Sequence, residues 1–413
     1  MVYSRRLIDD ELDELLAGLS AVALEGPKGV GKTATATRRA SRVFSLDDDA
    51  QRATVATEPA TLDRVDGTVV IDEWQRHPPV WDHVRRQVDG GAPPGRYLLT
   101  GSAMPVDAPA HSGAGRIVPV RMRPLSLAER QLDTPAVSLG GLLTGSRPAV
   151  QGDTSVSLTG YVDEILGSGL PGIRPLAPRL RVRQLDGYLE RLVLRDFADQ
   201  GLAVRRPEAV RAWLTAYAAA TATTTSYNAI LRAATPGEDD KPAKTTTIAY
   251  REVLAQLWML DAVPGWVPTR NRLARLMQAP KHHLADPALA ARLLQADHEV
   301  LLRDGHLLGR LFEGLVTQSV QVYAGLAGAR VSHLRQEAGR REVDLIVEGP
   351  GLRVLALEVK LTRSPGDGDV RNLLWLRDQL GDDLLDAVVV TAGPYAYRRP
   401  DGVAVVPAAL LGP

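Results

Sequence analysis

The 413-residue chain contains no cysteine, which excludes disulfide bonds, thiolate metal sites and a cysteine nucleophile. Its formal net charge is zero, because 49 Lys and Arg residues balance 49 Asp and Glu residues. Nucleic-acid binding would therefore have to come from local basic patches. No apolar run reaches the roughly 18 residues of a membrane span, and no apolar segment typical of a signal peptide follows the N-terminal residues. We expect a cytoplasmic protein without a membrane partner.

The apolar content is that of a globular protein, at 45% of residues, and the length predicts two or three domains. In the first third, short apolar runs alternate with helix-length segments, which predicts a parallel sheet covered on both faces. The expected strands are 21–25, 43–46, 68–71, 97–100 and 116–121. A helix over 11–19, capped by Asp9 or Asp10, is expected before them.

Residues 26 to 33 match the phosphate-binding pattern GxxxxGK[ST]. The strand expected before them and a helix expected over 34–42 place backbone N–H groups and a helix N-terminus where a triphosphate binds. An ordinary glycine-rich turn is the alternative, and these flanking elements disfavour it. The residues expected to bind the nucleotide are Gly26, Pro27, Lys28, Gly29, Val30, Gly31, Lys32 and Thr33.

Hydrolysis of ATP also needs a carboxylate near Mg²⁺ and a group that orients water. Lys32 is expected to contact the β- and γ-phosphates, and the Thr33 hydroxyl to ligate Mg²⁺. Asp72 and Glu73 follow the apolar strand 68–71, so we expect Asp72 in the Mg²⁺ shell and Glu73 as general base. A solvated acidic turn is the alternative for this pair.

Two further catalytic candidates follow later strands. Thr100 ends the apolar run 97–100, and Ser102 lies two residues later. We expect Ser102, or Thr100, to hydrogen-bond the γ-phosphate or the attacking water. A cap at the strand end is the alternative. Arg116 is expected to stabilise transition-state charge, in the same chain or toward a neighbouring subunit of a homo-oligomer. An ordinary surface arginine is the alternative for Arg116.

The middle of the chain differs from the first third in composition and pattern. Residues 134–156 are rich in Gly, Ser, Thr and Pro, which predicts a linker. Helical patterns follow over 161–166, 180–200 and 207–221. Two more helices lie between 223 and 260, joined by a polar connection over 236–244 and followed by a hairpin-like piece over 263–267, which indicates a winged helix.

The last third predicts a second α/β unit. Helices are expected over 286–294, 306–324 and 370–380, and strands over 330–334, 341–347, 352–360 and 387–391. A hairpin joining the second and third of these strands would bring Asp344, Glu358 and Lys360 onto one face. Two carboxylates suit Mg²⁺, and a lysine stabilises a pentacovalent phosphate or positions water. Glu313 is a further expected ligand. A charged strand face is the alternative.

Residues 1 to about 140 resemble an AAA+ type ATPase through the loop 26–33, Asp72-Glu73 and Thr100-Gly101-Ser102. The rest resembles the domain of unknown function that accompanies this ATPase in a large prokaryotic family. The matching stretches are 124–129, 169–171, 188–190, 195–196, 281–289, 311–313 and 342–360. The resemblance implies an ATPase domain at 1–140, a linker and winged-helix-like domain at 141–280, and a PD-(D/E)XK nuclease-like domain of restriction-endonuclease fold at 281–413.

In that nuclease motif the matching positions are Asp344, Glu358 and Lys360, with Val343 where the motif has proline. The leading hypothesis is an ATPase that uses Mg·ATP to control a C-terminal module directed at DNA or RNA. The alternative is a signalling or scaffold ATPase whose nuclease-like domain is silent and binds a protein. A basic surface for nucleic acid, or merely solvated helix faces, comprises Arg205, Arg206, Arg211, Lys241, Lys244, Arg270, Arg272 and Arg275.

Overall fold

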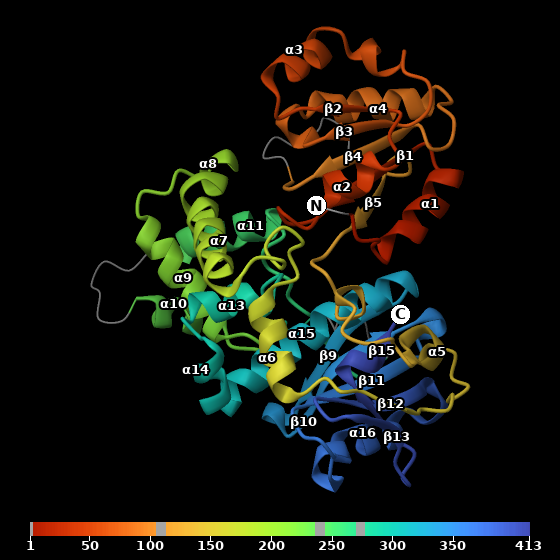
Figure 1. The fold of residues 1–413 in the computed structure, drawn as a ribbon, viewed down its shortest axis with the longest axis vertical. Helices are drawn as coiled ribbons and strands as arrows, with labels where there is room; N and C mark the ends of the chain where they lie inside the picture. The colour runs from red at the N-terminus through yellow and green to blue at the C-terminus, as the bar shows by residue number, and fades with distance from the viewer. Residues whose placement is uncertain (1–2, 105–112, 236–243, 270–276) are drawn as a thin grey trace.

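The computed structural model describes residues 3–104, 113–235, 244–269 and 277–413. A five-stranded sheet forms the core of its N-terminal part, drawn in red and orange in Figure 1. The strand order is β2-β3-β4-β1-β5 and every neighbouring pair is parallel, which confirms the predicted parallel sheet. The strands are β1 (Ala21–Glu25), β2 (Arg42–Ser45), β3 (Val69–Asp72), β4 (Tyr97–Gly101) and β5 (Val118–Arg121).

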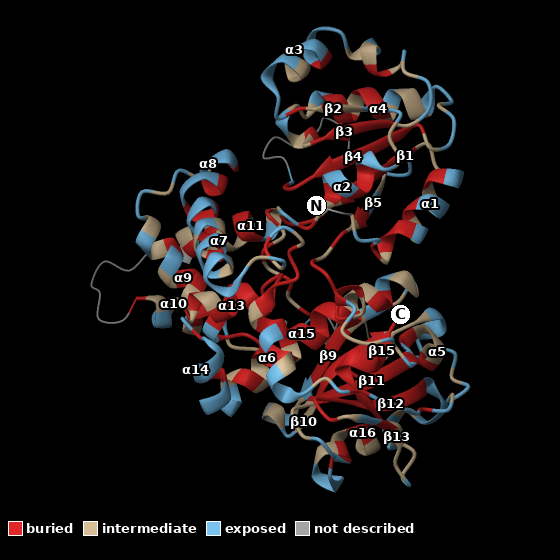
Figure 2. Ribbon diagram, viewed as in Figure 1, coloured by how far each residue is buried: buried red, intermediate tan, exposed pale blue. Residues whose placement is uncertain are grey.

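Helices cover both faces of this sheet because successive strand residues point to opposite sides. Val22 and Leu24 pack with Leu12 of α1 in one cluster, whereas Ala21 and Ala23 join the cluster that holds α3 and α4. All four of these strand residues are fully buried, as Figure 2 shows for the sheet as a whole. The helices are α1 (Ile8–Gly18), α2 (Lys32–Thr37), α3 (Asp49–Thr57) and α4 (Pro79–Asp89).

Two boundaries differ from the expectation. Helix α1 begins at Ile8, so Asp9 lies inside it and is not its cap. The Asp9 carboxylate instead accepts hydrogen bonds from the Arg6 N–H at 2.7 Å and from the Tyr3 hydroxyl. Helix α2 ends at Thr37, five residues before the expected end at 42. Three of its six residues are threonine, whose branched side chain disfavours helix.

A helical region, mainly green in Figure 1, lies to one side of the two sheets, at the left of the view. Its α13 packs against α6, α7 and α9, and its core includes the stacked rings of Trp213 and Tyr217, 5.3 Å apart. A five-residue π-helical turn, η4 (Leu192–Asp196), continues α7 into α8. The helices are α6 (Leu158–Gly167), α7 (Pro178–Arg191), α8 (Phe197–Asp199), α9 (Pro207–Ala219), α10 (Tyr227–Ala234), α11 (Lys244–Gln256), α13 (Pro287–Leu293) and α14 (His298–Arg303).

The segment expected to form the wing does not form a hairpin of its own. Gly265 and Trp266 make the short strand β8 (Gly265–Trp266), which pairs in parallel with β9 at the edge of the C-terminal sheet. Val263 bridges to Lys281. The expected connection between the two preceding helices falls at 236–243, outside the described residues. The middle region is therefore tied to the C-terminal sheet.

The C-terminal part is an eight-stranded mixed sheet with the order β7-β13-β14-β12-β11-β10-β9-β8. Helix α15 (Gly305–Leu326) packs on β9, β10 and β11, and α16 (Asp367–Leu380) packs with Ile346, Ala356 and Val389. The expected α/β unit is confirmed. Its strands are β7 (Gly152–Asp153), β9 (Arg330–Gln336), β10 (Arg341–Glu348), β11 (Val354–Lys360), β12 (Leu384–Thr391), β13 (Tyr395–Arg398) and β14 (Ala404–Pro407).

Residues 134–156, for which a linker was expected, contribute to this C-terminal part. Strand β6 (Val137–Ser138) pairs with β15 (Leu411–Gly412), and β7 pairs with β13. Helix α5 (Leu139–Leu143) packs near β11 and β12. The chain therefore reaches the C-terminal sheet before it builds the helical region. Short 3-10 turns complete the fold: η1 (Pro59–Leu62), η2 (Trp74–Arg76), η3 (Ala128–Arg130), η5 (Glu337–Gly339), η6 (Pro350–Leu352), η7 (Gly381–Asp383) and η8 (Ala408–Leu410).

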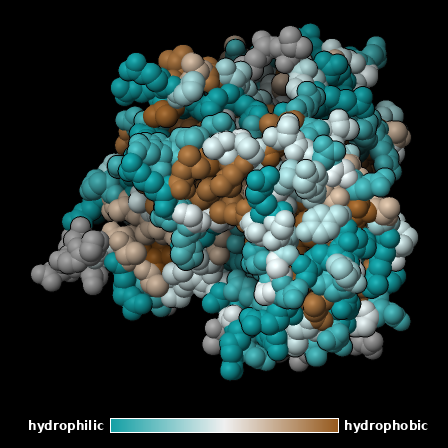
Figure 3. Space-filling view, turned by 60° about the horizontal axis from the view of Figure 1, so that its bottom comes forward, coloured by the Kyte–Doolittle hydropathy of each residue, from teal (hydrophilic) through white to brown (hydrophobic). Residues whose placement is uncertain are grey.

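The surface drawn in Figure 3 is mainly hydrophilic, with apolar side chains gathered in a patch near its centre. Across the described part of the chain, every helix is too short or too polar to cross a membrane.

Candidate functional site

The loop 26–33 connects β1 to α2 in a conformation that favours glycine. Gly26, Gly29 and Gly31 have φ angles of 151°, 82° and 102°. A Cβ atom on Gly26 would overlap the carbonyl oxygen of Met122, which follows β5. The loop therefore lies tightly against the end of the neighbouring strand and leaves its backbone close to any bound phosphate.

The Lys32 side chain is folded back over this loop. Its Nζ donates hydrogen bonds to the carbonyl oxygens of Gly26 at 2.8 Å and Pro27 at 2.9 Å. Burial lowers the pKa of Lys32 to about 8, although the Glu73 and Asp72 charges oppose that shift. An anion bound in the loop would supply the ammonium with a charged partner that the two carbonyls do not provide.

Three hydroxyl and carboxylate groups meet at the ends of β3 and β4 and at the start of α2. The Thr33 hydroxyl donates to Asp72 Oδ1 at 2.8 Å, and the Thr100 hydroxyl donates to the same oxygen. Burial raises the pKa of Asp72 despite these bonds. A hydroxyl and a carboxylate that already touch are the hard oxygen donors that Mg²⁺ takes, so the residues present fit that ion.

Glu73 is held beside this group. Its backbone is left-handed, with φ at 53°, and its carboxylate accepts a hydrogen bond from Ser102 Oγ at 2.7 Å. Gln75 donates to the same carboxylate and, at 3.1 Å, to Ser102. The structure thus brings Glu73 and Ser102 together, as the sequence predicts for residues at the ends of adjacent strands.

A cavity of about 1330 Å³ opens beside the phosphate loop. The loop, Asp72 and Glu73 form one wall, and the N-terminal residues Tyr3 and Arg6 form another. The remaining wall comes from the helical region and includes Arg174 and Arg181. A nucleotide in this cavity would contact both regions of the chain.

Two further loop residues bond to the helical region or the N-terminus. The Lys28 ammonium donates to Asp196 at 2.6 Å, and the Tyr188 hydroxyl donates to the Lys28 carbonyl at 3.2 Å. The Val30 carbonyl accepts from Arg6 at 2.7 Å. These bonds connect the stretches 188–190 and 195–196 to the loop.

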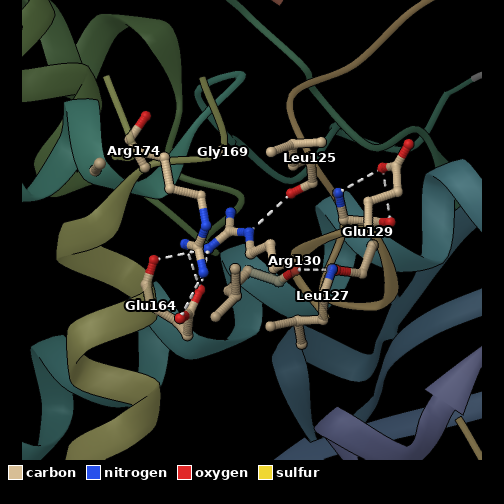
Figure 4. Close-up of polar contacts among 12 residues, drawn as sticks. Leu125, Leu127, Glu129, Arg130, Glu164, Gly169 and Arg174 are labelled. Carbon is tan, nitrogen blue, oxygen red and sulfur yellow. Dashed lines mark hydrogen bonds and ion pairs between the residues drawn. The ribbon is translucent and has the colours of Figure 1, made fainter. Parts of the chain in front are cut away.

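The stretch 124–130 forms a buried polar bridge between the regions (Figure 4). Arg130 donates to the Leu125 carbonyl at 2.9 Å and to the Glu164 carbonyl at 2.7 Å. Arg174 binds both oxygens of the Glu164 carboxylate, at 2.7 and 2.9 Å. Glu129 accepts from Arg6 at 2.7 Å. These charges are buried but paired, so they order the cavity wall.

Asp286 connects the same wall to helix α13. Its Oδ2 accepts hydrogen bonds from Ser168 Oγ at 2.6 Å and from the Gly169 N–H at 2.8 Å. Its Oδ1 accepts from the Ala288 N–H at 2.9 Å and caps the helix. The Gly169 carbonyl in turn accepts from the Leu125 N–H at 2.8 Å.

Arg116 lies outside this cavity. Its guanidinium is half-exposed and donates to Asp89 at 2.8 Å. The structure therefore does not bring it to the phosphate loop of its own chain. Of the expected basic surface, Arg205, Arg206 and Arg211 are in the described part, Lys244 is described by its backbone alone, and Lys241, Arg270, Arg272 and Arg275 lie outside it.

A second charged cluster lies between α15, β10 and β11. The register pairs Leu345 with Leu357, so Asp344 and Glu358 fall side by side. The pairing of β10 with β9 is irregular between Val343 and Ile346, and Asp344 Oδ2 accepts from the Val359 N–H at 3.0 Å. Lys360 donates to Glu358 at 2.6 Å. The predicted residues are thus neighbours.

A residue that the sequence reasoning did not include occupies this cluster. Lys281, only 1% exposed, places its Nζ 2.8 Å from Glu313 Oε1 and 3.0 Å from Asp344 Oδ1. Glu342 Oε1 is 3.4 Å away. In the sequence, this lysine is the first residue of the matching stretch 281–289. No group of three His, Asp or Glu residues in the described ranges is arranged to hold a metal ion.

The pKa values of the carboxyl groups in the cluster are shifted in different directions. Lys281 and then Lys360 lower the pKa of Asp344 despite its burial. Burial, and then the Asp344 charge, raise the pKa of Glu313 to about 8 and that of Glu358 to about 8. The ammonium thus supports one ionised carboxylate, and its neighbours hold protons more strongly than free glutamates.

Comparison with known families divides the chain into three. A model described as an AAA domain matches residues 19–131. Two domains of unknown function match 161–300 (DUF8612) and 308–411 (DUF4143). The strand order and the loop geometry agree with the first match. Residues 19–131 are therefore similar to an AAA domain.

Relatives of this chain include uncharacterized proteins of Mycobacterium bovis and Mycobacterium tuberculosis. Each is 26% identical over 416 residues, covering 99% of this chain and 84% of the relative. Among solved structures, the Walker-type ATPase of Pyrococcus abyssi has a TM-score of 0.42 at 15% identity, covering 71% and 96% of the two chains. The ORC2 protein of Aeropyrum pernix has 0.31 at 13%, covering 73% and 96%. Because these TM-scores are below 0.5, the similarity of residues 19–131 to an AAA domain rests on the family match alone.

Proposed function

We propose that this protein binds and hydrolyses Mg·ATP at the loop 26–33, and that the state of this site is transmitted to the C-terminal domain. The observation that carries the proposal is the contact of the Thr33 hydroxyl with Asp72, at 2.8 Å, beside the Glu73–Ser102 pair. Phosphate cradle, metal donors and a water-orienting carboxylate lie together at the ends of adjacent parallel strands.

Each residue then has one role. Water would bond to the γ-phosphorus of bound ATP while the bond to the β–γ bridging oxygen breaks, which releases ADP and inorganic phosphate. Lys32 neutralises phosphate charge, and Thr33 and Asp72 hold the Mg²⁺. Glu73 accepts the proton of the attacking water, with Ser102 keeping its carboxylate in place.

Transmission to the C-terminal domain is supported by the stretch 281–286. At one end, Asp286 bonds to Ser168 and Gly169 in the segment that continues to the cavity wall. At the other end, Lys281 enters the cluster between α15 and β10. A shift of the cavity wall on nucleotide binding would act on both ends, since only a few residues separate them.

A nuclease-like role for the C-terminal domain is supported by its element order, α15-β9-β10-β11-α16-β12, with Asp344, Glu358 and Lys360 on the central hairpin. In this leading form the module is directed at DNA or RNA. The second candidate, a silent domain that binds a protein, is favoured by one observation: the Lys281 ammonium already contacts Asp344, one of the expected metal ligands, at 3.0 Å.

Turnover of ATP with Mg²⁺ or with EDTA tests the first part. Lys32→Ala should abolish both binding and turnover, whereas Glu73→Gln should keep binding and lose turnover by about 10²-fold or more. Glu58→Gln, at an exposed glutamate far from the cavity, is the matched control and should behave as wild type. Wild-type turnover in Lys32→Ala would refute the site.

Cleavage of single- and double-stranded DNA and RNA, with and without ATP, tests the second part. Metal-dependent cleavage that is lost in Glu358→Ala, while ATP binding stays intact, would support the nuclease-like module. Absence of cleavage under every condition would favour the silent domain.

A further inference from the structure

The Lys281 ammonium is a buried cation with three acidic neighbours. Its Nζ contacts Glu313 at 2.8 Å, Asp344 at 3.0 Å and Glu342 at 3.4 Å. The three acids come from α15 and β10, but the lysine comes from the segment before α13. It is therefore inserted from outside the hairpin that carries the carboxylates.

The backbone fixes this insertion. The Lys281 N–H donates to the Val263 carbonyl at 2.9 Å, and the Val263 N–H donates to the Lys281 carbonyl at 2.9 Å. The next residue, His282, exchanges backbone bonds with Ala222 and Thr223. Because bonds hold the main chain on both sides, the side chain has little freedom to leave the cluster.

The same cluster contains a carboxylate oxygen that is available to ligate a cation. Glu358 is 7% exposed, and its Oε2 has no hydrogen-bond partner in the described part of the chain. Its other oxygen is bound to Lys360. A buried carboxylate oxygen without a partner is costly, and it would be satisfied by a divalent ion shared with Asp344.

We infer that Lys281 is a resident cation that keeps divalent metal out of this site, so that Asp344 and Glu358 form a latent metal site closed by the protein's own ammonium. The distances around Asp344 explain why metal is excluded. A divalent ion would have to lie about 2.0–2.6 Å from Asp344 Oδ1, the oxygen that Lys281 Nζ already holds at 3.0 Å. Two cations in that buried space repel each other strongly, because the protein interior screens charge poorly.

The inference concerns the C-terminal cluster alone and does not depend on ATP turnover. It makes Lys281 the residue that decides whether the nuclease-like carboxylates bind metal. The site is then incapable of metal chemistry while Lys281 stays in place.

Manganese binding measured by calorimetry, without nucleotide, tests the inference in the full chain. Lys281→Ala should gain a Mn²⁺ site with affinity at least about tenfold above wild type. Lys281→Ala with Asp344→Asn is the matched control and should lose that gain. Mn²⁺ held at the phosphate loop contributes equally to all three proteins, so the differences report on the cluster.

Lys281→Gln guards against failure of the alanine variant to fold, because its amide still donates to Glu313 but carries no charge. Thermal unfolding of Lys281→Gln should shift upward with Mn²⁺, and the shift should vanish with Asp344→Asn. Equal, Asp344-dependent Mn²⁺ binding in wild type and Lys281→Ala would overturn the inference. So would the absence of any Asp344-dependent gain in both Lys281 variants.

Discussion

Asp286 gives the sharpest quantitative test of the connection between the nucleotide cavity and the C-terminal domain. In Asp286→Ala, helix α13 loses its N-cap bond to Ala288, which costs about 1 kcal/mol. The Ser168 hydroxyl and Gly169 N–H are left as buried donors without a partner, each costing about 1–3 kcal/mol. The expected loss of unfolding free energy is about 3–7 kcal/mol.

Asp297→Ala is the matched control, because Asp297 caps the neighbouring helix α14 but is exposed. Its single bond to the Val300 N–H, at 2.9 Å, predicts a loss of about 1 kcal/mol. Urea unfolding followed by tryptophan fluorescence measures both variants. A loss in Asp286→Ala no larger than that in Asp297→Ala would refute the reasoning, since the two interior bonds would then contribute nothing.

Three other predictions follow from single side chains. Ser102→Ala should lower kcat for ATP about tenfold and leave KM nearly unchanged, because Glu73 loses the bond that positions it. Lys281→Met should cost about 3–5 kcal/mol of stability, since it leaves buried carboxylates without their cation. His283→Leu should flatten the fall in stability between pH 7 and pH 5, which the wild type shows because burial and the Lys281 charge lower the pKa of His283 to about 3.

The sign of the histidine effect follows from proton uptake. Below pH of about 6.5 the unfolded chain binds a proton at His283 that the folded chain does not, so stability falls as the pH falls. Over pH 7 to 5 the loss is about 2 kcal/mol. An unchanged slope in His283→Leu, a fall of affinity instead of kcat in Ser102→Ala, or wild-type stability of Lys281→Met would each contradict its prediction.

The nucleotide site was predictable because its determinants are local. The loop 26–33 carries its own conformational signature, and Asp72, Glu73 and Ser102 each follow an apolar run. Carboxyl ends of parallel strands meet at one edge of a sheet, so order along the chain translates into proximity. The observed bond between Ser102 and Glu73 is the physical form of that rule.

Other features depend on contacts between distant segments. Asp9 looks like a helix cap, but its carboxylate is taken by Arg6 and Tyr3. Residues 134–156 have the composition of a linker, yet β7 pairs with β13, more than two hundred residues later in the chain. No local pattern encodes such a pairing, because its energy comes from the partner strand.

Lys281 shows the same limit at a functional site. Glu313, Asp344, Glu358 and Lys360 were predicted from their order on a helix and two strands, and the structure brings them together. The lysine that neutralises them lies before α13, and its arrival depends on the Val263 bridge. The sequence indicated the carboxylates but not the lysine that lies among them, and it therefore favoured a bound metal.

Hydrogen–deuterium exchange of residues 281–286 and 341–360, with and without Mg·ATP, shows directly whether the nucleotide site acts on the C-terminal domain. In Glu73→Gln, which should bind ATP without turnover, we predict a change of exchange in both segments on adding ATP. Lys32→Ala should show none. ATP binding by Glu73→Gln with unaltered exchange in both segments would contradict the claim that the nucleotide site acts on the C-terminal domain.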